Sequence, residues 1–269
     1  MKRFPISLAG VSALLYAFLY APILVVIVYS FNAARFGSTW GGFTTRWYAV
    51  LMENPLAWAA ARNTLILGLV STGIATVLGS LLAFGLARFR IPLKSFTIGL
   101  LRVPIFIPDI VMAVALLMFY SLARQWFGLF ELGLPTMIVA HVTFQIPFVT
   151  IVVGARLAGM DPSLEEASRD LGANEIQTFL HVTLPLIAPG IIAASMLAFT
   201  LSLDDFVVSF FTSGPGSTTL PILIYSSVKR GITPDINALS TFIIAISMAA
   251  TLAATVLQRS WKYRSIRDI

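Results

Sequence analysis

Three carboxylates stand inside stretches that are otherwise apolar. Asp109 follows Pro108, and Asp204 and Asp205 are adjacent in a run that holds no other charged residue. An Asp at the centre of a bilayer costs about 2.5–3.5 kcal/mol on insertion scales, so it normally faces a cavity, an opposite charge or a solute pathway. The chemistry that these residues suit is recognition of a cation, not bond making.

Helical spacing gives the two adjacent carboxylates different surroundings. In a continuous helix Ser202 and Asp205 share a polar face, whereas Asp204 lies on a largely apolar face. We therefore expect Asp205 to line an aqueous pathway and Asp204 to contact a neighbouring helix or subunit. The alternative is that both lie just outside the membrane and are solvated. For Asp109 the alternative is a helix-entry residue or a structural ion pair near the cytoplasmic face.

Aromatic residues accompany these carboxylates. An ammonium group pairs with a carboxylate and also lies favourably over an aromatic face, so the combination suits a cation with methylene segments. Trp47 belongs to an aromatic-rich connection that equally suits the membrane–water interface. The predicted lining of the pathway is Asp109, Ser202, Asp204, Asp205, Phe206, Phe210, Tyr225 and Trp47.

The sequence lacks the residues that nucleotide binding, thiol chemistry and covalent catalysis require. The sequence has no phosphate-binding G-x-x-x-x-G-K-[ST] loop, no cysteine, and no Ser/His/Asp arrangement for covalent catalysis. His141 and His181 are far apart and have no carboxylates at ligand spacing, so we expect no metal site. We predict that the chain is not an enzyme and holds no cofactor. The energy for any transport must come from a partner or from an ion gradient.

The elements that must position these residues are membrane spans. Of the 269 residues, 58% are hydrophobic and 11% are charged, whereas soluble domains have roughly 25% charged residues. Apolar stretches of about 20 residues cross a bilayer as helices. We predict an all-α integral membrane protein with six transmembrane helices, at about residues 6–31, 63–87, 103–123, 134–155, 186–211 and 236–258.

Two of these spans carry patterns of their own. In the fourth, His141 and Gln145 are four residues apart, which favours interhelical hydrogen bonds over a proton relay. In the second, small residues recur every four positions and predict close approach of another helix. These small residues are Ser71, Ala75, Gly79, Ala83 and Ala87.

The basic residues predict the orientation in the membrane. Lys and Arg are concentrated at the N-terminus, in the loop 88–94 and in the tail 259–269. The positive-inside rule then places both termini and the segment 161–185 in the cytoplasm. This distribution also accounts for the net charge of +6 without a nucleic-acid partner.

Segment 161–185 is the one long polar stretch between predicted spans. Ser163 followed by Glu166 has the spacing of a capping box, and Gly172 can adopt the left-handed conformation that ends a helix. A second short helix is predicted to end near Pro185. The segment thus predicts two short helices joined by a glycine turn, with an amphipathic surface in water.

A spaced motif runs through this segment: Glu166-Ala167-Ser168, then Gly172, then Val182-x-Leu184-Pro185. It resembles the EAA loop of the membrane subunits of binding-protein-dependent ABC importers, with Ser168 in place of the second Ala. The resemblance implies docking on a partner ATPase, which would bind ATP and Mg. The alternative is an ordinary amphipathic helix between two spans. The coupling residues that it implies are Glu165, Glu166, Ala167, Ser168, Gly172, Leu184 and Pro185.

Three further runs carry a closer resemblance: LSLDDF at 201–206, SGPGSTTLP at 213–221 and PDINA at 234–238. With most of the chain, they resemble the second permease of bacterial putrescine/spermidine ABC importers. The resemblance implies the type I importer permease fold. Its parts would be a first helix and periplasmic loop in 1–62, a transmembrane core in 63–258 and a basic cytoplasmic tail in 259–269.

The resemblance also implies partners. The permease would pair with a homologous second permease, above two ATPase subunits and below a periplasmic polyamine-binding protein. Polyamines would cross from periplasm to cytoplasm by alternating access, driven by ATP hydrolysis in the partners. Putrescine and spermidine both fit this interpretation.

Other functions stay open from the sequence. The same machinery could carry Fe(III), a sulfate-type anion or another small solute, although the intramembrane Asp residues argue against an anion. A secondary transporter could couple to protons through Asp109, His141 and the pair Asp204 and Asp205, but no convincing inverted repeat is present. A passive channel or scaffold subunit is the remaining alternative.

Overall fold

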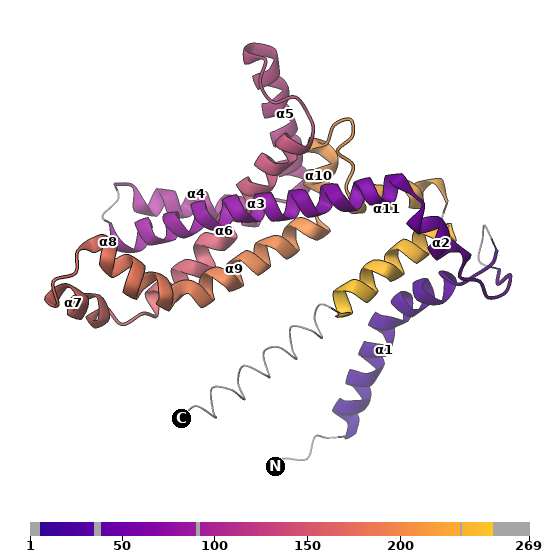
Figure 1. Ribbon diagram of the computed structural model, residues 1–269, viewed down its shortest axis with the longest axis horizontal. Coiled ribbons are helices and arrows are strands. Elements are labelled where there is room, and N and C mark those ends of the chain that lie inside the picture. The colour runs from indigo at the N-terminus through magenta and orange to yellow at the C-terminus, as the bar shows by residue number, and fades with distance from the viewer. Residues whose placement is uncertain (1–5, 35–38, 90–91, 232, 250–269) are drawn as a thin grey trace. The chain divides into compact units, whose positions relative to one another are not determined.

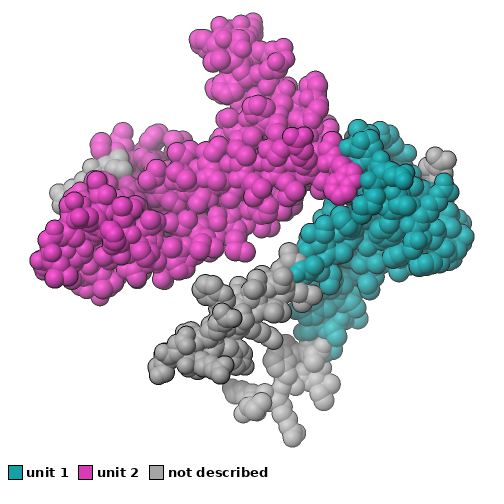
Figure 2. All heavy atoms as spheres, in the orientation of Figure 1, with its two compact units in different colours: residues 1–57, 224–269 teal, residues 58–223 magenta. Residues whose placement is uncertain are grey.

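The structure is a computed structural model that describes residues 6–34, 39–89, 92–231 and 233–249. Within these residues the regular structure is helical, apart from one isolated bridge between Asn32 and Phe43. The chain divides into two compact units, which Figure 2 shows in different colours. Unit 1 comprises residues 1–57 and 224–269, unit 2 comprises residues 58–223, and each is described by itself.

Unit 1 begins with α1 (Ile6–Tyr29), in the position of the predicted first span. Most of its described side chains are exposed, as expected for a helix whose surroundings are lipid or a partner. After α1 the chain turns at the buried Asn32, whose Oδ1 accepts hydrogen bonds from the backbone N–H of Ala34 and Gly41. The short helix α2 (Arg46–Met52) follows this loop.

Unit 2 is a bundle of helices in which α7 and α8 lie at the same end as the last turns of α3 (Figure 1). Two helices, α3 (Pro55–Arg88) and α11 (Leu220–Arg230), begin in one unit and end in the other. The remaining elements are α4 (Lys94–Phe106), α5 (Asp109–Phe127), α6 (Leu134–Ala158), α7 (Ser163–Asp170), α8 (Glu175–Thr178), the π-helical turn η1 (Phe179–Thr183), α9 (Leu184–Asp204) and α10 (Val207–Thr212).

The second predicted span starts earlier than expected. Helix α3 begins at Pro55, not near residue 63. The side chain of Asn54 accepts hydrogen bonds from the backbone N–H of Leu56 and Ala57, and Pro55 occupies a first helical position, where its missing N–H costs nothing. The first turns of α3 are therefore fixed by a cap that the hydropathy pattern did not reveal.

The third predicted span, 103–123, is wrong as a single helix. The chain instead forms α4 and α5, separated at Ile107 and Pro108, whose ψ angles of 133° and 136° are extended. A residue that precedes proline is disfavoured in the helical region, which explains the break before Pro108. Asp109 is consequently the first residue of α5.

The fifth predicted span, 186–211, differs from the structure at both ends: its helix begins before residue 186 and is interrupted at Asp205. Helical structure runs without a gap from Glu175 through η1 into α9, so the predicted end near Pro185 is wrong. The wider π-helical turn just before Pro185 lets the helix continue past a residue without an N–H. The helix then ends at Asp204, and Asp205 is extended with ψ of 120°.

The core of unit 2 confirms the predicted close packing of small residues for Ser71 to Ala83, whereas Ala87, the last predicted member, is exposed. Ala75 and Ala83 of α3 are buried, and a Cβ added to Gly79 would lie 2.7 Å from Cβ of Val149 on α6. Thr150 of α6 donates a hydrogen bond to the carbonyl of Gly79 at 3.2 Å. Only a residue without a side chain allows this approach of the two helices.

Five described helices are long and apolar enough to cross a membrane. They are Gly10–Tyr29, Pro55–Arg88, Asp109–Phe127, Leu134–Ala158 and Glu175–Asp204. The predicted sixth span, 236–258, is described only to Ala249, within the apolar helix Pro234–Ala249. Its remainder and the predicted tail 259–269 lie outside the described residues.

Candidate functional site

The loop between α6 and α8 has the predicted helix–turn–helix form, with a different cap. Helix α7 starts at Ser163, and the side chain of Asp161 accepts a hydrogen bond from the Ser163 backbone N–H at 3.0 Å. Ser163 is therefore inside the helix, and the predicted capping box is wrong. The Ser163 backbone N–H holds the pKa of the Asp161 carboxyl below its ordinary value. Gly172 has φ of +87°, which confirms the predicted left-handed turn.

A pair of hydroxyls joins the two short helices of this loop. Ser168 Oγ of α7 lies 3.2 Å from Thr178 Oγ1 of α8. Asn174 and Gln177 close a reciprocal capping box at the start of α8, with both hydrogen bonds at 2.9 Å. Ser168, which departs from the Ala of the motif, thus has a contact that an Ala could not make.

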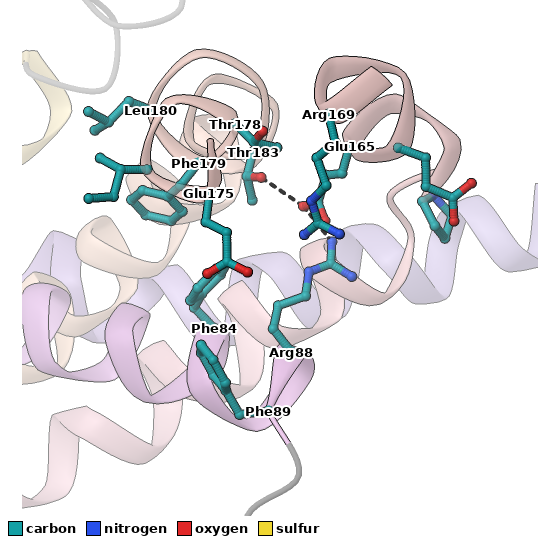
Figure 3. Close-up of a pocket in the computed structure, with 13 residues that line it drawn as sticks. Phe84, Arg88, Phe89, Glu165, Arg169, Glu175, Thr178, Phe179, Leu180 and Thr183 are labelled. Carbon is teal, nitrogen blue, oxygen red and sulfur yellow. Dashed lines mark hydrogen bonds and ion pairs between the residues drawn. The ribbon is translucent and has the colours of Figure 1, made fainter. Parts of the chain in front are cut away.

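Glu165 is turned away from solvent and holds the loop to the bundle. Its Oε1 accepts hydrogen bonds at 2.7 Å from Nη2 of Arg88, at the end of α3, and from Oγ1 of Thr183 in η1 (Figure 3). Glu165 is 7% exposed, whereas its neighbours Glu166 and Ala167 are exposed. Glu165 therefore faces inward, whereas the first two residues of the motif, Glu166 and Ala167, face outward.

A cavity of about 520 Å³ lies beside this link. Phe84 of α3 and Phe179 of η1 pack edge to face on its wall, with ring centroids 4.8 Å apart (Figure 3). Large apolar side chains are exposed nearby: Leu171 at 90% and Ile176 at 71%. The cavity is lined by Phe84, Arg88, Phe89, Pro162, Glu165, Glu166, Arg169, Glu175, Ile176, Thr178, Phe179, Leu180 and Thr183.

The two adjacent carboxylates have opposite environments at the end of α9. Asp204 is exposed. Asp205 points inward: its Oδ1 accepts the backbone N–H of Val208 at 3.2 Å, and its Oδ2 accepts that of Ser209 at 2.7 Å. The continuous helix assumed from the sequence does not exist here, so Asp205 turns inward as a cap of α10 instead of facing an open pathway.

A buried polar cluster stands behind Asp205. Nε2 of His141, on α6, lies 3.3 Å from Oδ2 of Asp205 and 3.0 Å from Oγ of Ser209, and its Nδ1 lies 2.7 Å from Oγ of Ser202. Gln145, one turn along α6, donates to the carbonyl of Ala198 on α9 at 3.0 Å. These contacts confirm the predicted interhelical hydrogen bonds of His141 and Gln145.

Comparison with known proteins identifies the class to which this geometry belongs. Residues 75–262 match the family described as binding-protein-dependent transport system inner membrane component. The chain belongs to this family. It is a multi-pass inner-membrane permease component of an ABC transporter, and hydrolysis of ATP belongs to other subunits of such transporters.

Curated relatives cover nearly the whole permease. It is 43% identical over 250 residues to the spermidine/putrescine transport system permease protein PotC of Escherichia coli (strain K12), covering 93% of each chain. It is 40% identical over 257 residues to the putrescine transport system permease protein PotI of the same organism, covering 94% of this chain and 91% of PotI.

Solved structures share the fold of the permease. A chain of a bacterial ABC transporter involved in the import of the acidic polysaccharide alginate superposes with a TM-score of 0.76 at 21% identity, covering 94% of both chains. A chain of the MetNI methionine ABC transporter in an inward-facing conformation gives a TM-score of 0.57 at 21% identity, covering 81% of this chain and 99% of that one. The all-helical architecture is thus that of ABC importer permeases.

The other residues predicted to line a pathway are distributed over both units. In unit 2, Asp109 is exposed in the first turn of α5, where a carboxylate is stabilised by the helix dipole. Phe206 and Phe210 both follow Asp205 in the chain, and their ring centroids are 5.4 Å apart. In unit 1, Trp47 Nε1 donates to the carbonyl of Asn32 at 2.7 Å, so the indole supports the loop after α1.

Tyr225, also in unit 1, already interacts with a cation. Nζ of Lys229 lies 4.9 Å from the centroid of its ring. A substrate ammonium at this ring face would therefore compete with Lys229. Among the described residues, no group of three or more His, Asp or Glu side chains is placed to hold a metal ion.

The residues that sequence reasoning missed are those whose role depends on a distant partner. Arg88 was noted only as a loop cation, and Thr183 was not noted, yet both bind Glu165. Their spacing along the chain gives no signal of the contact. For Ser168 a signal existed, because a hydroxyl at a motif position for Ala is a substitution that a hydrogen bond can explain.

Proposed function

We propose that this permease moves polyamines, putrescine or spermidine, from periplasm to cytoplasm by alternating access. The observation that carries the proposal is 43% identity, over 93% of the chain, to a spermidine/putrescine transport system permease. Six spans with both termini in the cytoplasm, a first helix in 1–62, a core in 63–258 and a tail in 259–269 complete the proposed organisation.

The carboxylate that meets the cargo in this proposal is Asp204. It is exposed at the end of α9, on a face that continues along the helix through exposed Thr200 and Met196. The carboxylate oxygens of Asp205 accept hydrogen bonds from α10 and lie beside His141. Asp205 therefore does not contact the cargo in this proposal and acts on it only through its negative charge. An ammonium group approaching Asp204 would then meet the field of two carboxylates.

Aromatic and polar residues extend this route. Phe206 and Phe210 lie directly after the Asp pair and offer ring faces to methylene and ammonium groups of the cargo. In unit 2, exposed Asp109 is a further residue of the proposed lining. Ser202 is 2% exposed and supports the lining only through His141. Tyr225 and Trp47 are proposed as lining residues of unit 1.

Energy enters, in this proposal, through the loop that contains α7 and α8. The surface of this loop is partly apolar: it presents exposed Glu166 and Ala167 together with the apolar side chains of Leu171 and Ile176. Exposed apolar groups of this kind are typical of an interaction surface. A partner ATPase covering this surface would remove the apolar groups from water and transmit its closure to the bundle. The proposed assembly contains two ATPase subunits, a homologous second permease and a periplasmic polyamine-binding protein.

Uptake by cells tests the cargo. A strain without its own polyamine importers, given this permease and its partners, should accumulate labelled putrescine or spermidine, and unlabelled polyamine should compete. Fe(III) and sulfate should not compete. Inhibition of polyamine uptake by either ion, supplied at a concentration equal to the KM for the polyamine, would contradict the proposal. So would uptake that continues without the ATPase subunit and stops when the proton gradient is removed.

A further inference from the structure

One buried imidazole joins three helices of unit 2. His141 of α6 is fully buried, and its two ring nitrogens reach side chains on both sides of the break that separates α9 from α10. Nδ1 lies 2.7 Å from Ser202 Oγ on the α9 side. Nε2 lies 3.0 Å from Ser209 Oγ on the α10 side and 3.3 Å from Oδ2 of Asp205 at the break itself.

The two sides of the break are held differently. The end of α9 is anchored by several bonds: Gln145 donates to the Ala198 carbonyl, and Ser71 of α3 lies 3.4 Å from Ser202. The start of α10 is bonded through its N–H groups to Asp205, whose Oδ2 is in turn within reach of His141. Thr136 of α6 also bonds α10, but at its last residue, by donating to the Thr212 carbonyl at 3.0 Å. The imidazole is the polar side chain of α6 that reaches both the start of α10 and the anchored end of α9.

We propose that His141 is a positioning residue, which fastens the break between α9 and α10 and thereby holds the exposed Asp204 carboxylate in the orientation that receives the cargo. The last part rests on the proposed function, whereas the fastening of the break is a property of this chain alone. An imidazole suits the task because its two nitrogens reach partners in opposite directions. Without the imidazole, the buried hydroxyls of Ser202 and Ser209 and the carboxylate of Asp205 would each lose a hydrogen-bond partner, which is costly in a buried site.

Three variants separate positioning from general stability. His141→Leu keeps an apolar volume and removes every contact of the ring. His141→Gln retains an amide near the position of Nε2, within reach of Asp205 and Ser209. Thr150→Val is the matched control, because it deletes another buried interhelical hydrogen bond of α6, from the Thr150 hydroxyl to the Gly79 carbonyl of α3 at 3.2 Å, and has no hydrogen bond to α10.

Two measurements on the assembled importer read out these variants. Amide hydrogen exchange over residues 205–212 reports the break, and KM for labelled polyamine uptake reports the cargo contact. His141→Leu should speed exchange and raise KM, each by about tenfold, as expected for losing a hydrogen bond to a charged group. His141→Gln should recover most of both losses, and Thr150→Val should change neither.

Each other outcome overturns part of the proposal. Unchanged exchange in His141→Leu would show that the imidazole does not fasten the break. Faster exchange with an unchanged KM would assign His141 a structural role only, and an equal effect of Thr150→Val would do the same. If His141→Leu fails to assemble, Ser209→Ala, which removes one ring contact, must show the same two changes in milder form. Wild-type uptake by Asp204→Asn would refute the cargo contact while the exchange result still decides the fastening.

Discussion

Asp204 and Asp205 are neighbours in the chain with separate tasks. Asp204 ends α9 in an exposed position, and Asp205 binds the first N–H groups of α10 and faces His141. Charge removal at the two positions should therefore have different consequences. Asp205→Asn should loosen α10 and reduce the amount of assembled complex, whereas Asp204→Asn should leave assembly intact.

The first prediction concerns uptake by the Asp204 variants. A hydrogen bond to a charged group contributes about 1.5–3 kcal/mol, so Asp204→Asn should reduce polyamine uptake per assembled complex by about ten- to a hundredfold. Asp204→Glu should retain part of the activity because the charge survives. Labelled uptake normalised to assembled complex measures this. The polyamine affinity of the isolated binding protein serves as the control and must not change. Wild-type uptake by Asp204→Asn would remove this residue from the route.

Gly172 permits a second test at the residue scale, because its φ of +87° is strained for a β-branched residue while no atom lies within 4 Å of an added Cβ. Gly172→Val should lower binding-protein-stimulated ATPase activity and uptake together, whereas Gly172→Asn, which tolerates this conformation, should retain much of both. Gly172→Asp has the same backbone tolerance as Asn, so any further loss measures the effect of a charge in the docked surface. Full stimulated activity in Gly172→Val would show that the turn is not needed for coupling.

The residue types predicted the local turns of the site but not the contacts between distant segments. Gly172 was predicted correctly, because a glycine at motif spacing has a local conformational cause. The inward turn of Glu165 was missed, since its partners Arg88 and Thr183 are brought to it only by the fold. The inward turn of Asp205 was missed for the same reason: its partners, the first N–H groups of α10 and a buried imidazole, are brought to it only by the fold.

At the scale of elements, the long helices followed from hydropathy and their interruptions did not. Predicted spans near α1 and α6 agree with the structure to within a few residues. The break before α5 had a visible cause in Pro108, yet the apolar run on both sides outweighed it in our prediction. The passage of α9 through Pro185 depends on a π-helical turn, which no residue pattern in the chain indicates.

The link from Arg88 to Glu165 and Thr183 predicts how α7 transmits movement to α3 and α9. Removing either charge should free the loop, so Arg88→Ala and Glu165→Gln should keep ATPase activity in the assembled complex but lose most of the uptake per ATP hydrolysed. The ratio of transported polyamine to ATP hydrolysed is the measurement.

The chain supplies a matched control for this prediction. Arg124 and Glu131 form another ion pair, at 3.7 Å, with side chains 60% and 84% exposed. Exposed pairs contribute little, so Arg124→Ala should not alter the transport ratio. An unchanged ratio in Arg88→Ala, or equal losses in Arg124→Ala, would contradict the role of the link. The exchanged pair Arg88→Glu with Glu165→Arg should restore part of the ratio.

At the scale of the whole molecule, single cysteines test the proposed orientation cleanly, because the sequence has none. Exposed positions should be chosen: Ser217 is 3% exposed and therefore unsuitable, whereas Thr218 and Ser95 are exposed. Thr218→Cys should react with an impermeant thiol reagent from the periplasm. Ser95→Cys, next to the basic loop 88–94, should react only after the cytoplasmic side is opened, and the reverse pattern would invert the orientation.

The central claim is that this permease imports polyamines with energy from ATP hydrolysed by its partners. The direct measurement is uptake of labelled putrescine and spermidine into proteoliposomes that hold the purified complex, with the binding protein on the side of uptake and ATP on the side of the ATPase subunits. We predict saturable uptake of at least one of the two that requires ATP, the ATPase subunits and the binding protein together. Uptake that persists without ATP under an imposed proton gradient, or no uptake of either polyamine by a complex whose ATPase is stimulated by another solute, would contradict the account.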